Sequence, residues 1–588
     1  MVRRVVLACV LGLAARFVTA IQIDSLLLPD EPLQRASLPS LRLAEAVAVA
    51  PLASLRPASL GAADQLDGIA AWNRSGAVPA RNGFARPLPL PKAVRFTADL
   101  LKSQPGRLAG GALLAPPSGG LVWGAEVRVE DSHRLRLHLA KVALPKGARI
   151  WVYGEGTEEV SVAAGDVTFQ GEIWTPSVAG PAIRLEVRLP EGGIDGSRFV
   201  IDQVLESFEL KADGSPRLPG EPKEDLSCLQ DAACFDSSAL GIMDVYKRAV
   251  ARLEFVNGGQ GFLCSGGLLN DADTSTVIPY LLTANHCLST QATVSTLEAF
   301  FDYIDAGCHG AAPSLGSVPR TNGATLLATG EGSDFTLVRL ASLPPGRGLL
   351  GSTSEVIANG TELQRLSHPQ GMPMAYSVTT VTGSGPHCDL RPRPNYLYSS
   401  HTFGGIFGGS SGSPVVRASD GKVVGQLLGE CGTAGSSGCD TVTSVLDGAL
   451  STTWPSISSF LTSPPPPPPP PPVACTPTST ALCLNGGRFQ VEATFNTGAQ
   501  HGRARVVKLT DETGYLWFFS NTNVEVVVKV LDACTLNQRF WVFAAGLTNV
   551  QVTLTVTDTS NGTVKTYNNP QGAAFQPILD SSAFATCP

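Results

Sequence analysis

Thirteen cysteines divide this chain of 588 residues more sharply than any other feature. After Cys9 the next cysteine is Cys228; eight cysteines then lie between 228 and 439, and four lie between 475 and 587. Each of the two later blocks holds an even number and can close its disulfides internally, as expected in an oxidising compartment. No pair has the C-x-x-C spacing of zinc ligands, so we predict no metal site. The distribution predicts separately folded regions, the first of them free of cysteine.

The N-terminus has the pattern of a signal peptide. Arg3 and Arg4 precede an apolar run at 5–15, and small residues at 18–20 suit signal peptidase. The run is too short to span a hydrocarbon core of ~30 Å. The net charge of −7 is spread along the chain without long charged runs, so it indicates neither a nucleic-acid nor a membrane partner. We therefore predict a signal peptide at 1–20 and a secreted, monomeric protein.

The cysteine-free region, 21–224, changes pattern along its length. Residues 21–85 are rich in Leu, Ala and Pro and poorly patterned, which predicts a loose lead-in. From about residue 93 the pattern is that of strands. Apolar residues alternate with charged ones at 134–139 and at 183–189, as in half-buried strands of a sandwich.

Nine consecutive prolines, 464–472, follow the first cysteine block. Such a tract forms polyproline II, a stiff spacer of roughly 28 Å at about 3.1 Å per residue. Beyond it, alternating segments at 524–530 and 550–556 predict an immunoglobulin-like β-sandwich of some seven strands over 473–588. For the numerous aromatics of this region we expect core packing rather than a platform for a ligand: Trp517, Phe518, Trp541 and Phe543.

Three short motifs in the middle region carry the chemistry. They are Thr-Ala-Asn-His-Cys at 283–287, Ser-Asp-Phe-Thr-Leu at 333–337 and Gly-Gly-Ser-Ser-Gly-Ser-Pro at 408–414. A serine hydroxyl is a poor nucleophile until an imidazole takes its proton, and the imidazole needs a carboxylate to fix its tautomer. His286, Asp334 and Ser411 supply these groups in the order of the chymotrypsin class, not of subtilisins or α/β-hydrolases. Each motif alone is ordinary; the ordered combination predicts a catalytic triad.

With these motifs, residues 228–463 resemble the secreted bacterial trypsin-like proteases, most closely the lysyl endopeptidase group. The resemblance includes Cys264-Ser265-Gly266-Gly267-Leu268 before the histidine and Gly425-Gln426-Leu427 after the serine. It implies a mainly β fold with a chymotrypsin-like double β-barrel at 225–463, no cofactor, and protein or peptide substrates.

The same resemblance implies three disulfides: Cys264–Cys287, Cys234–Cys308 and Cys228–Cys431. Cys388 and Cys439 have no counterpart in the family. They can pair with each other, or Cys439 can pair with Cys431, which would leave Cys228 and Cys388 to be paired differently.

By the same resemblance, the backbone amides of Gly409 and Ser411 are expected to form the oxyanion hole, and Gly412 to permit close substrate approach. Ser410 stands where the more familiar motif has an aspartate. Activation by an ion pair from a new N-terminus to that residue is therefore excluded. His368-Pro369-Gln370-Gly371 is interpreted as a turn rather than a functional histidine.

The expected specificity pocket departs from the family pattern. Gly405 replaces the trypsin-type acid, Val445 replaces the pocket aspartate of lysyl endopeptidases, and Leu428 replaces their assisting histidine. Asp447 lies two residues beyond Val445 and would face the same way in a strand. We therefore expect Asp447 to bind a Lys or Arg side chain, with a structural role for this aspartate and a small, apolar or glutamyl specificity as the alternatives.

Together these observations predict a secreted serine endopeptidase made as a precursor. The predicted parts are the signal peptide at 1–20, a propeptide at 21–224, the protease domain at 225–463, the proline linker at 464–472 and the C-terminal sandwich at 473–588. The maturation site is expected between Leu218 and Ser227, around Lys223. The alternatives are an inactive protease-like adhesion protein and a chain whose C-terminal domain is the working part.

Overall fold

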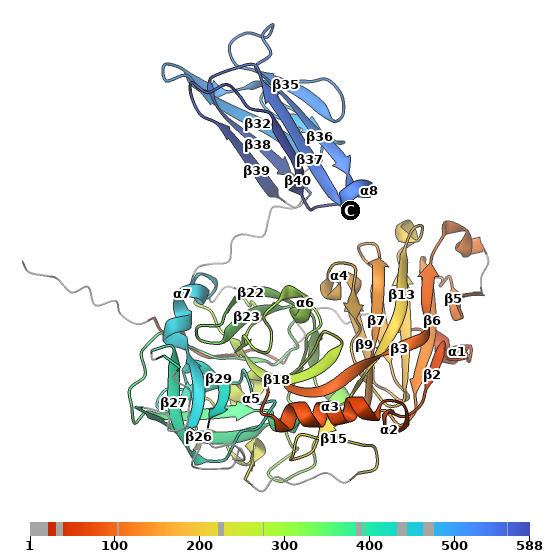
Figure 1. The fold of residues 1–588 in the computed structure, drawn as a ribbon, viewed down its shortest axis with the longest axis vertical. Coiled ribbons are helices and arrows are strands. Elements are labelled where there is room, and N and C mark those ends of the chain that lie inside the picture. Colours follow the sequence, from red (N-terminus) through yellow and green to blue (C-terminus); the bar gives the residue numbers. More distant parts are fainter. Residues whose placement is uncertain are drawn as a thin grey trace, which may run out of the picture. The chain divides into compact units, whose positions relative to one another are not determined.

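The structure is a computed structural model, and it is mainly β, as predicted (Figure 1). It describes residues 21–30, 39–102, 105–221, 228–273, 276–383, 391–392, 394–431, 444–462, 475–560 and 562–587. The predicted signal peptide, the proline tract, the centre of the expected maturation site, Cys388 and Cys439 lie outside these ranges. The chain divides into two compact units, 1–463 and 464–588. Within the described ranges, no helix has the length and apolarity needed to cross a membrane.

Residues 228–462, which we call the two-barrel region, contain two closed barrels. The first barrel has the strand order β21-β20-β17-β18-β19-β23-β22, and β21 and β22 are separated only by Gly323, which closes the ring. Its strands are β17 (Val250–Asn257), β18 (Gln260–Leu269), β19 (Tyr280–Ala284), β20 (Glu298–Phe301), β21 (Arg320–Asn322), β22 (Ala324–Gly330) and β23 (Phe335–Leu340).

The second barrel has the order β26-β25-β28-β29-β30-β27, and it closes because β26 also pairs with β27. Its strands are β25 (Glu362–Ser367), β26 (Ala375–Thr382), β27 (Tyr396–Phe403), β28 (Pro414–Arg417), β29 (Val423–Cys431) and β30 (Ser444–Ala449). Helix α7 (Leu450–Leu461) follows β30 and buries Leu450, Ile457 and Leu461. The predicted double β-barrel is therefore confirmed.

Residues 21–221, which we call the N-terminal half (of unit 1), contain a β-sandwich with its own apolar core. One layer comprises β2 (Ala53–Leu55), β4 (Gly106–Leu108), β5 (Gly111–Leu114), β6 (Leu121–Val129), β8 (Arg149–Tyr153), β9 (Glu159–Ala163) and β12 (Ala182–Leu189). The other comprises β3 (Ala80–Arg95), β7 (Arg134–Ala143), β10 (Ile173–Trp174), β11 (Val178–Ala179) and β13 (Arg198–Ser207).

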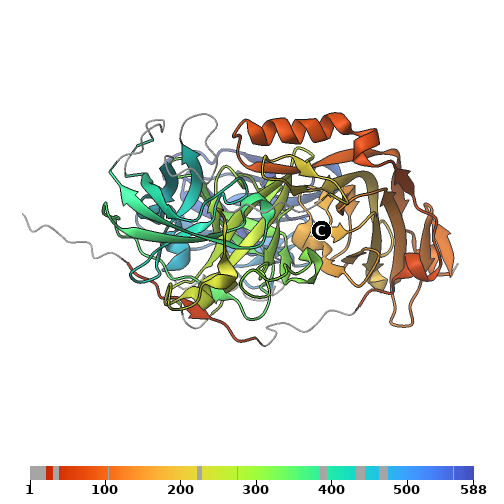
Figure 2. The ribbon, with the colours of Figure 1, turned by 90° about the horizontal axis from the view of Figure 1, so that it is seen from below.

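The loose lead-in expected at 21–85 is wrong. This stretch contains helix α3 (Ala63–Arg74), which runs alongside the start of β3 (Figures 1 and 2). Trp72 of α3 donates a hydrogen bond to the Pro79 carbonyl at 2.9 Å, and its ring packs edge-on against Phe262 of the first barrel. These tertiary contacts order a segment whose own sequence has no clear periodicity.

Strand β3 joins the two regions. It pairs with β13 inside the sandwich and with β18 of the first barrel, where Gln260 lies opposite Phe84 and Leu263 opposite Ala80. One sheet of twelve strands therefore runs through both regions. The N-terminal half is not packed as a separate body, although its sequence composition sets it apart.

A buried charge cluster lies where the sandwich meets the barrel. The alternation at 134–139 predicts Arg134 and Arg136 on a solvent face, but both are buried. The Arg136 guanidinium lies 3.6 Å from the Glu298 carboxylate of β20 and donates to the Thr296 carbonyl at 2.8 Å. Glu298 also accepts the Ser177 amide, at 3.0 and 3.1 Å. The predicted outer face of β7 is thus an interface.

The cluster continues with a second acid. Arg320 of β21 lies 3.6 Å from Glu298 and donates to Glu158 at 2.9 Å. Glu158 also accepts from Arg134 at 2.8 Å. Charges of both signs therefore alternate across the interface, with residues 134–177 on one side and residues 298–320 on the other.

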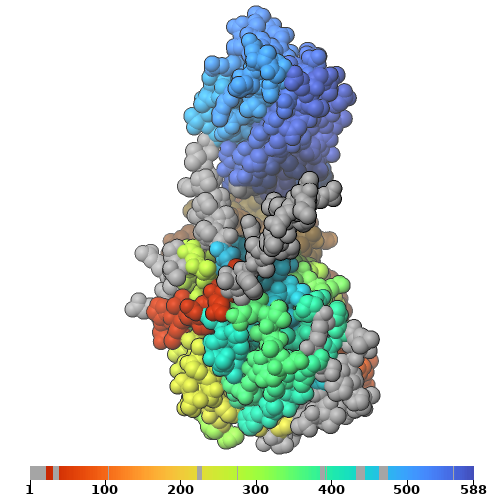
Figure 3. Space-filling view, turned by 90° about the vertical axis from the view of Figure 1, so that its left-hand side faces the viewer, coloured from red at the N-terminus to blue at the C-terminus, as the bar shows by residue number. Residues whose placement is uncertain are grey.

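The first ten residues that the structure describes lie on the two-barrel region rather than on the sandwich. Strand β1 (Leu26–Leu27) pairs antiparallel with β24 (Gly348–Leu349). This segment, 21–30, which we call the strap, lies at the surface (red at the left of Figure 3). Ile23 and Leu28 nevertheless join the core of the two-barrel region.

The C-terminal unit is a sandwich of two five-stranded sheets around one core, so it has ten strands where about seven were expected. One sheet holds β31 (Leu482–Leu484), β32 (Phe489–Asn496), β33 (His501–Arg503), β38 (Gln551–Asp558) and β39 (Thr563–Asn569). The other holds β34 (Arg505–Lys508), β35 (Thr513–Trp517), β36 (Val526–Ala533), β37 (Arg539–Gly546) and β40 (Ile578–Phe584). Of the four aromatics assigned to the core, Phe518 is buried there, while Trp517, Trp541 and Phe543 are half-buried on the outer face.

We predict that Glu298→Gln lowers the free energy of unfolding of unit 1 by about 3 kcal/mol or more, because it leaves buried guanidinium groups without their counter-charge. Denaturant unfolding of the chain measures this. Asp99→Asn is the control, since Asp99 pairs with Lys102 in solvent and its loss should change stability by less than about 0.5 kcal/mol. Equal effects of the two substitutions would contradict the role given to the cluster.

Candidate active site

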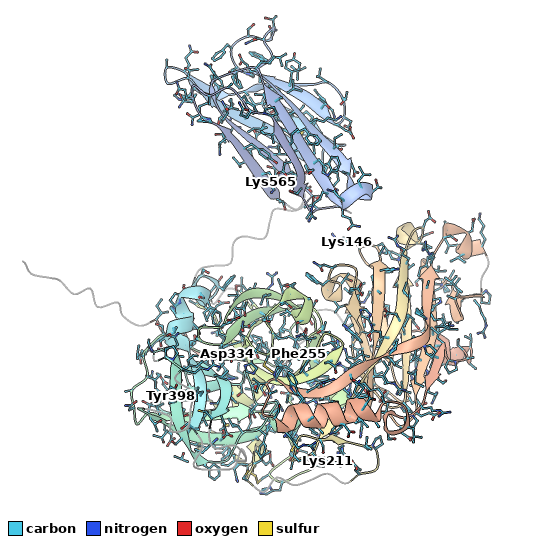
Figure 4. All side chains as sticks on the ribbon, in the orientation of Figure 1. Lys146, Lys211, Phe255, Asp334, Tyr398 and Lys565 are labelled. Carbon is cyan, nitrogen blue, oxygen red and sulfur yellow. A yellow bond between two sulfur atoms is a disulfide. The ribbon has the colours of Figure 1, made fainter. Side chains whose placement is uncertain are left out.

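The barrels bring two of the three predicted triad residues into direct contact. His286 lies just after β19 and Asp334 just before β23, and these strands pair with Ala284 opposite Phe335. His286 Nδ1 lies 2.8 Å from Asp334 Oδ2, and the His286 amide donates to Asp334 Oδ1 at 2.9 Å. The carboxylate accepts from Nδ1–H, so Nε2 carries the free lone pair. Figure 4 shows Asp334 inside the two-barrel region.

The backbone around Asp334 is held from the second barrel. Asp334 has a left-handed φ of 51°, and its carbonyl accepts from the Asn285 amide at 3.0 Å. The buried Gln426 side chain of β29 donates to the Ser333 carbonyl at 2.7 Å and to the Asp334 carbonyl at 3.2 Å. Gln426 is a positioning residue that sequence reasoning did not assign; its only signal was its place in the Gly-Gln-Leu motif.

Ser411 lies in the turn before β28 and is only 3% exposed. Its carbonyl accepts from the Ser265 amide at 2.7 Å, which ties the turn to β18 of the first barrel. His286 Nε2 is buried and has no hydrogen-bond partner among the described residues, so the serine–histidine hydrogen bond is not formed in this structure. Such bonds are often long before substrate binds.

The backbone conformation of the glycine-rich turn explains why glycine occurs there. Gly409 and Gly412 have φ values of 97° and 79°, which other residues rarely adopt. Within the described residues, the amides of Gly409 and Ser411 donate no hydrogen bond. The role expected for Gly412 is corrected: a Cβ there would overlap with the Thr283 hydroxyl and the Ser265 carbonyl, so this glycine permits barrel packing rather than substrate approach.

Two neighbouring polar residues have structural contacts. The buried Ser410 hydroxyl lies 3.1 Å from the Ser367 hydroxyl. His368 precedes a short 3-10 turn at Pro369–Gly371, and its Nδ1 lies 3.0 Å from the Met372 carbonyl. Burial lowers the pKa of His368 to about 3, so this histidine is neutral and belongs to the turn.

A cavity of about 660 Å³ opens beside Ser411. Residues of the second barrel that line it include Ile406, Phe407, Gly408, Leu428, Gly429 and Glu430. The remaining wall comes from the N-terminal half and includes Gly76, Val78, Ala80 and Asp213. A Cβ placed on Gly408 would lie 3.0 Å from the Ala80 side chain, so the first residue of β3 contacts the glycine-rich turn directly.

The three residues expected at the specificity pocket lie in different surroundings. Leu428 lines the cavity, but Val445 is buried in a small core with Ile406 and Leu427. Asp447 is fully buried, and its carboxylate accepts from Arg365 at 2.7 Å. Burial raises the pKa of Asp447 although Arg365 opposes this. Asp447 is thus an internal ion-pair partner, not an acid at the base of the pocket.

Glu430 is the acid that the second barrel contributes to the cavity wall. Its side chain is 19% exposed, and Oε1 lies 2.7 Å from Nε2 of the buried His401 on β27. Sequence reasoning did not assign Glu430. Strand alternation could not single it out, because β29 has an irregular register between Leu427 and Gly429.

The structure contains the disulfides Cys264–Cys287 and Cys234–Cys308. Cys228 and Cys431 are both disulfide-bonded, and their mutual pairing stays a prediction. The C-terminal unit holds two more bridges, Cys475–Cys483 and Cys534–Cys587. Two groups of candidate metal ligands combine the first two bridges with His286 or His309, but oxidised cysteines offer no thiolate to a metal.

Comparison with known proteins agrees with this geometry. Residues 223–446 match the family model of the lysyl endopeptidase C-terminal domain. The predicted resemblance to the lysyl endopeptidase group is therefore confirmed for this part of the chain, which is less than half of its length.

Individual relatives cover similar parts. A lysyl endopeptidase of Pseudomonas aeruginosa is 28% identical over 310 residues, which are 50% of this chain and 64% of that protein. The secreted RxLR effector protein 73 of Plasmopara viticola is 29% identical over 244 residues, 39% of this chain and 56% of that protein. The chain thus spans less than two thirds of either relative. The crystal structure of the protease Anisep from Arthrobacter nicotinovorans aligns with 37% of this chain and 96% of its own, at 18% identity and a TM-score of 0.28.

Proposed function

We propose that this protein is a secreted serine endopeptidase, with Ser411 as nucleophile, His286 as general base and Asp334 as the residue that orients His286. The observations that carry the proposal are the His286–Asp334 pair, held by both carboxylate oxygens, and the close packing of Gly412, next to Ser411, against Thr283 and Ala284 just before His286. The match to the lysyl endopeptidase model supports the same reaction class.

In the proposed reaction, Ser411 Oγ attacks the scissile carbonyl carbon while His286 Nε2 takes the hydroxyl proton. The imidazolium is stabilised by Asp334 and then gives this proton to the leaving amine. Water repeats the two transfers and releases the acid product. The free amides of Gly409 and Ser411 would receive the oxyanion, a contribution of typically 10²–10³ in rate per donor.

We further propose cleavage after basic residues, with Glu430 as the group that binds the basic side chain. A partly exposed carboxylate on the cavity wall attracts a cation, and His401 fixes its position. The name of the Pseudomonas relative, lysyl endopeptidase, supports the basic preference.

The N-terminal half is proposed to act as a propeptide that covers the cleft. Asn73 joins three of its parts: the side chain bonds both backbone groups of Arg81 at 2.8 Å and donates to the Gly214 carbonyl at 2.8 Å. This holds residues 76–80 and 212–214 against the cavity beside Ser411. Substrate binding at Ser411 therefore requires that these residues leave.

We predict that Ser411→Ala abolishes peptidase activity and labelling by a fluorophosphonate, because the Ser411 hydroxyl is the nucleophile of the proposed reaction. Secreted protein from cells that express the full chain is assayed for both. Ser237→Ala, an exposed serine of the same region, is the control and should retain both. Turnover by the Ser411 variant would refute the triad assignment.

We predict that Glu430→Gln lowers kcat/KM for Lys and Arg peptides at least tenfold, about 1.4 kcal/mol of transition-state binding, with little change for peptides that have an apolar residue at that position. Asp447→Asn serves as the comparison. It should lower stability, since Arg365 loses a buried partner, without changing the ratio of basic to apolar cleavage. If the ratio of basic to apolar cleavage changed in Asp447→Asn but not in Glu430→Gln, then Asp447 rather than Glu430 would be the residue that binds the basic side chain.

A further inference from the structure

The strap, residues 21–30, is bound to the two-barrel region along its whole length. The amide and carbonyl of Ile23 bond Ser352 at 2.9 and 3.0 Å, the Leu28 amide donates to the Arg347 carbonyl at 2.9 Å, and the Gly346 amide donates to Pro29 at 2.9 Å. This is the β-augmentation mode by which extended peptides bind a sheet edge.

Side chains add specific contacts at both ends of the strap. Lys422 donates to the Ile23 carbonyl at 2.6 Å and forms an ion pair with Asp24. Arg248 forms an ion pair with Asp30 at 2.7 Å. Ile23, only 4% exposed, inserts into the core of the two-barrel region beside the first of these anchors.

The surface that receives the strap is shaped for it. A Cβ on Gly351 would overlap with the Ile23 carbonyl, and a Cβ on Gly346 would overlap with the Asp30 carboxylate. Small residues therefore stand where the strap backbone passes closest. The hydrogen bonds and ion pairs of the strap connect it to residues between 248 and 422, not to the sandwich.

We propose that the strap is an anchor that keeps the N-terminal half bound to the two-barrel region after the chain between them has been cut. The inference rests on the proposed role of that half as a propeptide over the cleft. A cut between 218 and 227 would leave attachments that include the strap, the β3–β18 pairing and the charge cluster around Glu298. Cleavage at this site would therefore produce a non-covalent complex with the cleft still covered.

The strap gives this complex much of its affinity because it is linked to the other attachments through residues 31–52. Binding at one site raises the effective concentration at the next, so linked contacts can exceed single affinities by 10²–10⁴. Release of the N-terminal half requires that the strap leave its groove or that it be separated from the sandwich by a second cut.

The test uses the Ser411→Ala chain, so that the reading does not depend on peptidase activity. A recognition site for an unrelated sequence-specific protease is inserted within 222–227 and cleaved. We expect the fragments to co-elute in size-exclusion chromatography and to give one mass in native mass spectrometry. Deletion of 21–30 should raise their dissociation constant at least 100-fold, and Ile23→Asp at least tenfold.

Leu26→Asp is the matched control, since Leu26 lies in the same strap with 41% of its surface exposed, and it should change the constant less than threefold. The two-barrel fragment of the cleaved deletion variant should bind a synthetic peptide of residues 21–30. It should bind this peptide at least tenfold more tightly than the same peptide with Ile23→Asp. Separation of the parent fragments on cutting, an unchanged constant after the deletion, or equal binding of the two peptides would each overturn the proposal. These results would stand even if the triad assignment were wrong, because every binding measurement uses the Ser411→Ala chain.

Discussion

The charge cluster around Glu298 fixes how the N-terminal half and the two-barrel region fit together. Buried charges are tolerated only when each has its partners, so an arrangement that shifts β7 against β20 would leave Arg136 or Glu298 unpaired in a dry interface. The same chemistry makes the interface separable. Charged groups regain full hydration in water, whereas a purely apolar interface of equal size would resist opening. The same interface can therefore hold the N-terminal half stably and still allow its release.

The position of β3 follows from this interface and determines what happens at the cleft. Once β3 is registered on β18, its first residue, Ala80, lies against Gly408. Helix α3 and the turn at 211–215 are carried with it through Asn73. The part of the cavity wall that the N-terminal half supplies is therefore a consequence of sheet pairing some distance away, and any change that frees β3 from β18 should remove this part of the wall.

Much of the fold and the His286–Asp334 pair could be predicted because the signals are local. Each triad residue stands in a short motif, and the barrels need only join the ends of β19 and β23 for His286 and Asp334 to meet. Predictions that depended on what packs against a strand failed. Alternation correctly gave the faces of β7 and β30, but nothing near Arg136 or Asp447 in sequence indicates that Glu298 and Arg365 cover those faces. Glu430 was passed over for a related reason, since an irregular register changes which side chains reach the cavity.

The most direct test of the account is the rate at which a small fluorophosphonate labels Ser411 before and after removal of residues 21–227. Because the reagent needs the same nucleophile and oxyanion amides as a substrate but little of the cleft, the comparison measures access to Ser411 itself. The account predicts labelling at least 100-fold slower in the intact chain than in the separated fragment 228–588. Equal labelling rates in the two forms would contradict the claim that the N-terminal half closes the site.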